Sequence, residues 1–90
     1  MYYTYVLFCT SKATDKKIFY IGSTSDLRNR FKEHLSHEVS TTKLFDKIDL
    51  VYYEACLDKT DARNRELQLK TGFGRGYLQR RLTSYLTKRH

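Results

Sequence analysis

The 90-residue chain has no proline and only two cysteines. Without proline, the ends of helices must be read from Gly, Ser, Thr and Asp residues. Cys9 and Cys56 lie far apart and form no Cys-x-x-Cys pair, so we expect two free, buried thiols in a reducing cytoplasm rather than a disulfide. The cysteines and histidines also lack the spacing of zinc ligands, which argues against a zinc site.

Long apolar runs are missing as well. No run approaches the roughly 18–20 residues that a membrane span requires. The apolar stretch at residues 2–9 has no basic segment before it and no small-residue cleavage site after it, so we expect no signal peptide. With 40% hydrophobic and 30% charged residues, the composition is that of a globular chain. We therefore predict one cytoplasmic domain that spans residues 1–90 and does not bind a membrane.

Acidic residues are absent from the last quarter of the chain. Residues 1–66 carry 11 basic and 10 acidic side chains, so six of the seven net positive charges belong to residues 67–90. A solvated helix face is one interpretation of this charge run. The other is a surface that contacts phosphates, where each cation neutralises one phosphate of a nucleic acid. The basic residues of this segment are Lys70, Arg75, Arg80, Arg81, Lys88 and Arg89.

The apolar pattern predicts the element order β-β-α-β-α-α. Strands are expected at 2–8, 18–22 and 48–55, the first two joined by a short polar turn. Helices are expected at 26–37, from Thr60 onward, and at 75–88, with Gly72 as the C-terminal cap of the second. Three strands cannot close a barrel, so the economical architecture is α+β, a small sheet covered by helices.

The first predicted helix has polar residues on the rim of its apolar face. Leu27, Phe31 and Leu35 recur every four residues and predict the buried stripe. Arg30 and His34 are also four residues apart and lie beside this stripe. A guanidinium and an imidazole at the edge of a core suit the binding of a phosphate. A snorkelling arginine and a hydrogen-bonded histidine are the alternative.

The second predicted helix places Glu66 on or beside the face formed by Ala62 and Leu69. A carboxylate is costly there unless it is paired with a cation. Arg63 and Lys70 are candidate partners for an ion pair. Alternatively, Glu66 is a ligand of Mg²⁺, which typically binds one or two carboxylates together with phosphates and waters.

Tyrosines cluster in the first two strands. Tyr3 and Tyr5 share one face of the first strand, with Thr4 on the other, and Tyr20 lies near the end of the second. A hairpin would bring Tyr5 and Tyr20 together, most simply as a packed cross-strand pair. A tyrosine hydroxyl can also donate to a phosphate or, with a lowered pKa, act as a base.

Taken together, these residues resemble the GIY-YIG domain over essentially the whole chain. Tyr3-Thr4-Tyr5 takes the place of the first motif, and Tyr20-Ile21-Gly22 resembles the second. Arg30 and His34 follow at the family's positions, and Glu66 resembles the glutamate of its later helix. The resemblance implies a three-stranded antiparallel sheet flanked by helices. It also implies metal-dependent hydrolysis of a DNA phosphodiester.

The resemblance implies a role for each of these residues. Glu66 would hold the divalent cation, Mg²⁺ or Mn²⁺, and Arg30 would bind and neutralise the scissile phosphate. Tyr5 would act as general base or orient the attacking water, assisted by Tyr20, and His34 would support proton transfer or phosphate positioning. The surface expected to bind DNA comprises Lys70, Arg75, Arg80, Arg81 and Lys88.

Two positions differ from the family pattern. Tyr3 stands where the first motif opens with glycine, and the chain has no asparagine after Asn64, where many catalytic members have one. The leading hypothesis is an endonuclease directed by DNA structure, acting in repair or recombination. The alternatives are a catalytically silent nucleic-acid-binding module and a nuclease subunit that is active only with a partner. Specificity would come from these residues, from a homodimer or from a protein partner.

Overall fold

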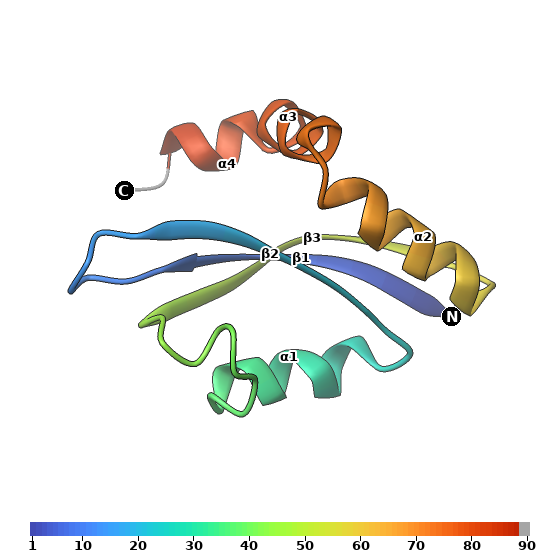
Figure 1. The fold of residues 1–90 in the computed structure, drawn as a ribbon, viewed down its shortest axis with the longest axis horizontal. Helices are drawn as coiled ribbons and strands as arrows, with labels where there is room; N and C mark the ends of the chain where they lie inside the picture. The colour runs from blue at the N-terminus through green and yellow to red at the C-terminus, as the bar shows by residue number, and fades with distance from the viewer. Residues whose placement is uncertain (89–90) are drawn as a thin grey trace.

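The computed structural model describes residues 1–88, which form a three-stranded antiparallel sheet between two layers of helix (Figure 1). This confirms the predicted α+β fold and its three-stranded antiparallel sheet. In chain order, the elements are β1 (Tyr2–Thr10), β2 (Lys17–Thr24), α1 (Leu27–Leu35), β3 (Lys47–Cys56), α2 (Lys59–Leu69), α3 (Gly72–Arg81) and α4 (Thr83–Lys88). None of the helices within residues 1–88 has both the length and the apolarity of a membrane span.

The sheet has the strand order β2-β1-β3, which makes β1 the central strand and β2 an edge strand. Six consecutive residues of β1, at positions 4–9, are buried, as expected for a strand that is covered on both faces. Tyr5 pairs with Gly22 across the hairpin, and Thr4 pairs with Ser23. Because side chains alternate along a strand, this register decides which β2 residues face each helical layer.

The helices lie on opposite faces of the sheet, with α1 on one side and α2, α3 and α4 on the other (Figure 1). Each face has its own apolar core, and β1 contributes alternate residues to both. The core on the α1 side contains Tyr5, Leu7, Cys9, Phe45 and Ile48. The core on the other side contains Val6, Ile21, Leu69 and Leu78.

The predicted apolar stripe of the first helix is partly wrong. Asp26 caps α1, since its carboxylate accepts from the backbone N–H of Asn29 at 3.1 Å. Leu27 and Phe31 pack on the core as expected, but Leu35 is 49% exposed and His34 is fully buried instead. The helix ends at Leu35, so the outer side of its last turn stays in solvent. Polar partners inside the core allow an imidazole to take the buried position.

The predicted third helix, 75–88, is in fact two helices, because α3 ends at Arg81 and α4 begins at Thr83. The hydroxyl of Thr83 donates to the backbone carbonyls of Gln79 and Arg80, both at 2.9 Å. Such side-chain bonds compete with the helical backbone pattern. The break divides the predicted DNA-binding residues, because Arg75, Arg80 and Arg81 lie in α3 and Lys88 lies in α4. Arg89 lies outside the described residues.

Gly72 does not cap the second helix as predicted. The helix α2 ends at Leu69, and Gly72 is the first residue of α3. The close approach of the two helices depends on a different glycine: a Cβ atom on Gly74 would lie only 1.9 Å from the carbonyl oxygen of Leu69. Gly74 therefore allows the start of α3 to lie against the end of α2.

Both cysteines are free thiols. Cys9 is buried as predicted, and burial raises its pKa to about 11. Cys56 is only partly buried, because it is the last residue of β3, where the sheet gives way to the turn before α2.

Candidate active site

The site forms where the hairpin register places Tyr5 against Gly22. The Tyr5 side chain is 1% exposed, and a Cβ atom at position 22 would lie 2.5 Å from its hydroxyl oxygen. The glycine of the Tyr-Ile-Gly motif thus leaves the space that the phenol occupies. Tyr5 therefore reaches across the neighbouring strand and presents its hydroxyl near the edge of the sheet.

Two residues of α1 contact this hydroxyl. The Nε2 atom of His34 lies 2.9 Å from the Tyr5 oxygen, and the Nε–H of Arg30 donates to the same oxygen at 3.4 Å. The ring of Tyr20 lies 5.0 Å from the His34 ring, centroid to centroid, and 6.4 Å from the Tyr5 ring. The four residues expected on this side of the sheet are therefore gathered in one cluster.

His34 also contacts a residue that the sequence did not indicate. Its Nδ1 atom lies 2.8 Å from the hydroxyl oxygen of Thr42, and both side chains are fully buried. Burial, together with the positive charge of Arg30, lowers the pKa of His34 to about 4. The imidazole is therefore neutral at physiological pH, so one nitrogen donates and the other accepts. Thr42 and Tyr5 occupy these two positions.

Arg30 and Tyr5 differ in charge at neutral pH. Burial raises the pKa of the Tyr5 hydroxyl, only partly offset by the hydrogen bond from Arg30, so the phenol keeps its proton. Hydrogen bonds to Glu33, at 2.8 Å, and to Tyr5 raise the pKa of the Arg30 guanidinium still further. The Arg30 side chain is 35% exposed, so its positive charge is accessible from solvent.

Glu66 approaches the same edge from the other helical layer. Its carboxylate accepts from the Ser23 hydroxyl at 2.7 Å and from Lys70 Nζ at 2.7 Å, and it forms an ion pair with Arg63 at 2.8 Å. The predicted ion-pair partners are confirmed. Ser23 is the neighbour of Gly22, on which Tyr5 lies, so the two sides of the site meet on β2.

The electrostatic environment keeps Glu66 ionised. At 5% exposure, burial alone would raise the pKa of its carboxyl. Hydrogen bonds from Lys70, Ser23 and Arg63 outweigh that effect and lower the pKa below its ordinary value. The charge of Glu66 in turn contributes to the raised pKa of Tyr5, which shows that the two groups are electrostatically coupled across the strand.

The donor set at this edge fits a hard divalent cation. Within residues 1–88, no group of three or more His, Cys, Asp or Glu side chains could hold a metal by itself, which disfavours zinc. Mg²⁺ and Mn²⁺ prefer oxygen ligands, and Mg²⁺ sites often combine one carboxylate with waters and substrate phosphates. Glu66, ionised and at the edge of the sheet, is a carboxylate of this kind.

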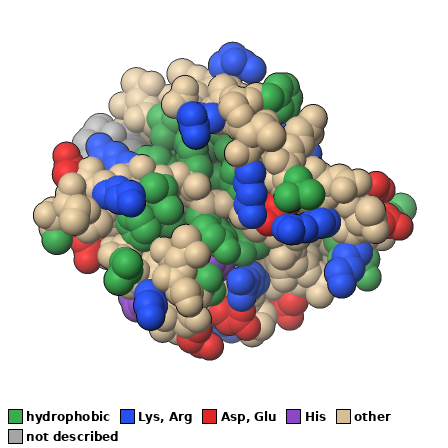
Figure 2. Space-filling view, viewed as in Figure 1, with side chains coloured by type: hydrophobic (Ala, Val, Ile, Leu, Met, Phe, Trp, Pro, Cys, Tyr) green, Lys and Arg blue, Asp and Glu red, His purple; other side chains and the backbone are tan. Residues whose placement is uncertain are grey.

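The predicted DNA-binding residues lie on the face of the sheet opposite α1. Figure 2 shows Lys and Arg side chains spaced around an apolar area on the face of the molecule drawn there. Lys70 adjoins Glu66, while Arg75, Arg80 and Arg81 lie on α3 and Lys88 on α4, all exposed. The geometry therefore places Lys70 next to Glu66 and the other four farther along the helices.

This fold and this cluster define a small α+β domain whose sheet edge carries a phenol, a guanidinium and a carboxylate, groups suited to phosphoryl chemistry. The family model of the GIY-YIG catalytic domain matches residues 1–81. The chain therefore belongs to the GIY-YIG family, a family of nucleases. Neither a search of the curated proteins nor a search of the solved structures returned a match.

Two residues of the site were missed in the sequence. Ser23 carried a signal, because it directly follows Tyr20-Ile21-Gly22 and must face the opposite side of β2 from Gly22. Thr42 carried none, because it lies between α1 and β3, in a segment without periodicity. Only the path of the folded chain brings Thr42 to His34.

Proposed function

We propose that the chain is a metal-dependent endonuclease that hydrolyses phosphodiester bonds in DNA. The observation that carries the proposal is the hydrogen-bonded cluster of Tyr5, Arg30 and His34 on one side of β2, with the ionised Glu66 on the other. Membership of the GIY-YIG family supports nuclease chemistry. The basic surface of α3 and α4 supports a polyanionic substrate.

In this reaction, the oxygen of a water molecule attacks phosphorus, one P–O ester bond breaks, and the leaving oxygen takes up a proton. The transition state concentrates negative charge on the phosphoryl oxygens, and fixed positive charge placed in advance stabilises it. Arg30 is suited to this task because its guanidinium is permanently charged, partly exposed and held by Glu33 and Tyr5.

The environment of Tyr5 favours orientation of the attacking water over proton abstraction. Its pKa is raised, so the phenol keeps its proton at neutral pH. The adjacent imidazole of His34, with a pKa of about 4, is a weak acceptor for that proton. We therefore assign Tyr5 to hydrogen bonding with the water, His34 to holding Tyr5, and Tyr20 to packing against the imidazole.

Glu66 is the residue that would hold the divalent cation. Bound there, the cation would supply compensation for charge that develops on the leaving oxygen. Ser23 would keep the carboxylate oriented through its hydrogen bond. Lys70 and Arg63, which now compensate the carboxylate, have side chains that are 47% and 56% exposed, so both can turn toward phosphate oxygens.

The test is cleavage of nicked, branched and single-stranded DNA with Mg²⁺ or Mn²⁺. Wild type is compared with Tyr5→Phe, Arg30→Ala and Glu66→Gln. We expect wild type to cut and each variant to lose at least about a hundredfold in kcat, as for removal of one transition-state contact. Preference for nicked or branched DNA would support a role in repair or recombination.

A silent nucleic-acid-binding module is the second candidate function, favoured by the two cations that already satisfy Glu66. It predicts salt-sensitive DNA binding without cutting in either metal, and that result would contradict the proposed activity of the isolated chain. Cutting that appears only when a co-purified protein is added would instead identify a nuclease subunit that depends on a partner.

A further inference from the structure

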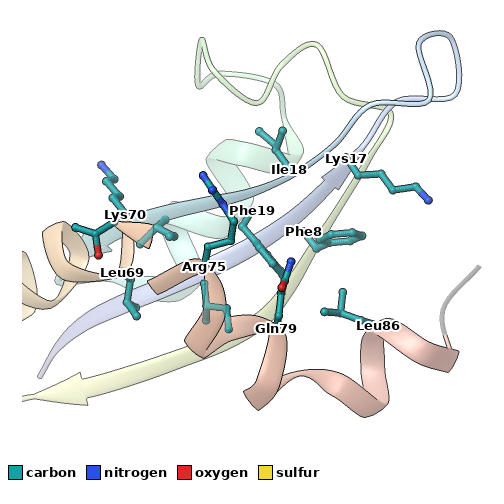
Figure 3. A pocket seen from close by; sticks show the side chains of 12 residues that line it. Phe8, Lys17, Ile18, Phe19, Leu69, Lys70, Arg75, Gln79 and Leu86 are labelled. Carbon is teal, nitrogen blue, oxygen red and sulfur yellow. The ribbon is translucent and has the colours of Figure 1, made fainter. Parts of the chain in front are cut away.

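A groove separates β2 from α3 and α4 on the face of the sheet opposite α1 (Figure 3). Its volume is about 480 Å³, within the range of roughly 300–1,000 Å³ typical of small-molecule sites. Apart from Lys70, none of its lining residues takes part in the proposed reaction. The groove is therefore a second feature of the surface, which the proposed reaction does not explain.

The floor of the groove is apolar and partly aromatic. The rings of Phe8 and Phe19 lie 5.3 Å apart, centroid to centroid, at an angle of 57°. Phe8 is 8% exposed, whereas Phe19 is only partly buried, so Phe19 offers ring surface to an incoming group. Figure 3 shows these two side chains in the middle of the groove, with Leu86 nearby. Such a floor suits a flat, weakly polar ring.

The rim of the groove is cationic. Lys17, Lys70 and Arg75 line it together with Gln79, all four exposed, and no acidic residue is among its lining residues. An apolar helix of a partner protein would cover the floor but add no negative charge for Lys17 and Arg75, and within residues 1–88 only Lys70 among these three cations has a salt-bridge partner, Glu66. A nucleotide matches both parts, because its base is a flat ring and its phosphate is an anion.

The groove is continuous with the candidate active site. Lys70 lines the groove and also donates to Glu66 at 2.7 Å. Along β2, Phe19 and Ser23 are four residues apart, roughly 13 Å at about 3.3 Å per residue. That distance corresponds to about four stacked nucleotides at roughly 3.4 Å each, and to fewer in an extended strand. A strand cut beside Glu66 can therefore reach Phe19 within a few nucleotides.

We propose that this groove binds one unpaired nucleotide of the DNA strand, with its base on Phe19 and its phosphate between Lys70 and Arg75. The identity of the polymer rests on the proposed function. A paired base cannot stack on Phe19 without leaving its duplex. The groove therefore selects DNA that is single-stranded a few nucleotides from the cut.

Photo-crosslinking tests this binding without any need for catalysis. A short single strand with one 5-iododeoxyuridine is irradiated with the wild-type protein in EDTA, and the same strand in a full duplex serves as the comparison. The crosslinked residue is identified by mass spectrometry. We expect crosslinks from the single strand to Phe19 or Phe8, and few or none from the duplex. Crosslinks only to residues outside the groove would overturn the proposal.

Affinity measurements with two matched variants provide a second test. Phe19→Leu keeps an apolar side chain but removes the aromatic face, and we expect it to weaken single-strand binding by roughly 5- to 100-fold with little change for duplex. Phe73→Leu is the control, because Phe73 is 53% exposed and stacks on Tyr77 rather than lining the groove. Thermal unfolding of both variants shows whether they are folded.

The outcomes separate this proposal from that of nuclease activity. Crosslinks at Phe19 without cutting in any metal would leave the groove assignment standing and the nuclease proposal rejected. Cutting that depends on Glu66, with equal single-strand binding by wild type and Phe19→Leu, would support the nuclease proposal and reject the groove assignment. A dimer in solution that Phe19→Leu dissociates would show that a second copy covers the groove, which also overturns the proposal.

Discussion

Thr42 and His34 form a buried polar pair inside the core on the α1 side. Their hydrogen bond at 2.8 Å satisfies the imidazole nitrogen that Tyr5 does not contact. A threonine hydroxyl at this place fixes which nitrogen faces Tyr5, and it thereby holds the phenol that the proposed reaction uses. The pair links the stability of the domain to the geometry of the site.

Replacing Thr42 by valine tests this link. The change removes the hydroxyl with little change in volume and leaves His34 Nδ1 buried without a partner. We expect the free energy of unfolding to fall by about 1–3 kcal/mol, measured by urea denaturation. Thr42→Ser, which keeps the hydroxyl, should retain most of that stability. An equal loss in both variants would assign the effect to the methyl group instead.

His34 also makes stability depend on pH. Its pKa is about 4 in the folded protein against 6.5 for an ordinary histidine, so the unfolded chain binds the extra proton between these values. Stability should therefore fall by about 3 kcal/mol as the pH drops from 6.5 to 4. The measurement is the urea midpoint against pH. His34→Asn should remove most of this loss of stability between pH 6.5 and 4. His37→Asn, at an exposed site, should leave the loss unchanged.

At the residue scale, the helical wheel predicted burial correctly for α2 but only in part for α1. The helical wheel placed Glu66 beside Ala62 and Leu69, and all three are buried. The wheel was wrong for Leu35 and His34. Apolar periodicity does not reveal that a polar imidazole is buried when its hydrogen-bond partners are distant in the sequence. Thr42 is such a partner, and a contact across a loop leaves no local pattern to read.

At the element scale, the strands were easier to predict than the last helices. The β-branched and aromatic runs of β1 and β3 contain the residue types that fit a pleated, half-buried surface. In contrast, the early start of α3 accompanies a tertiary contact with α2, and the break at Leu82 accompanies the side-chain bonds of Thr83. The helix α3 must cross the end of α2 closely, which Gly74 permits, and no periodicity within residues 72–88 records that contact.

Two glycine substitutions test this account of α3. Gly74→Ala places a Cβ atom against the backbone carbonyl of Leu69, which cannot move without shifting α2. We expect a loss of about 3 kcal/mol or more in unfolding free energy. Gly72→Ala is the control, since nothing lies within 4 Å of its Cβ position, and it should change stability by less than about 1 kcal/mol. Similar values for the two would refute the crossing argument.

At the scale of the whole molecule, the charge is sorted by face. The helices α3 and α4, which carry Arg75, Arg80, Arg81 and Lys88, lie opposite α1 (Figure 1), on the side from which Lys70 reaches Glu66. The sequence predicted the surplus of charge in residues 67–90 but not its separation into two helices. The family motifs name the candidate site residues, but they do not indicate that these residues approach the edge strand from both faces of the sheet.

The sorting of charge predicts the salt dependence of DNA binding. If Arg80 and Arg81 each neutralise one phosphate, the double alanine variant should reduce the slope of log K against log salt by about 2. Fluorescence anisotropy on a labelled duplex over a range of salt concentrations measures this slope. The control is Lys32→Ala with Lys43→Ala, two exposed cations outside α3 and α4, which should leave it unchanged. An equal effect of both pairs would mean that binding follows net charge alone.

The pairing of β1 with β2 has a consequence for how the protein folds. Tyr5 lies on Gly22 and Glu66 bonds to Ser23, so two adjacent residues of one strand serve opposite sides of the sheet. A hairpin misaligned by a single residue would turn both to the wrong side. It would separate the phenol from the carboxylate in one step, even with every helix formed. The register of this hairpin therefore decides whether the groups of the candidate site can meet at β2.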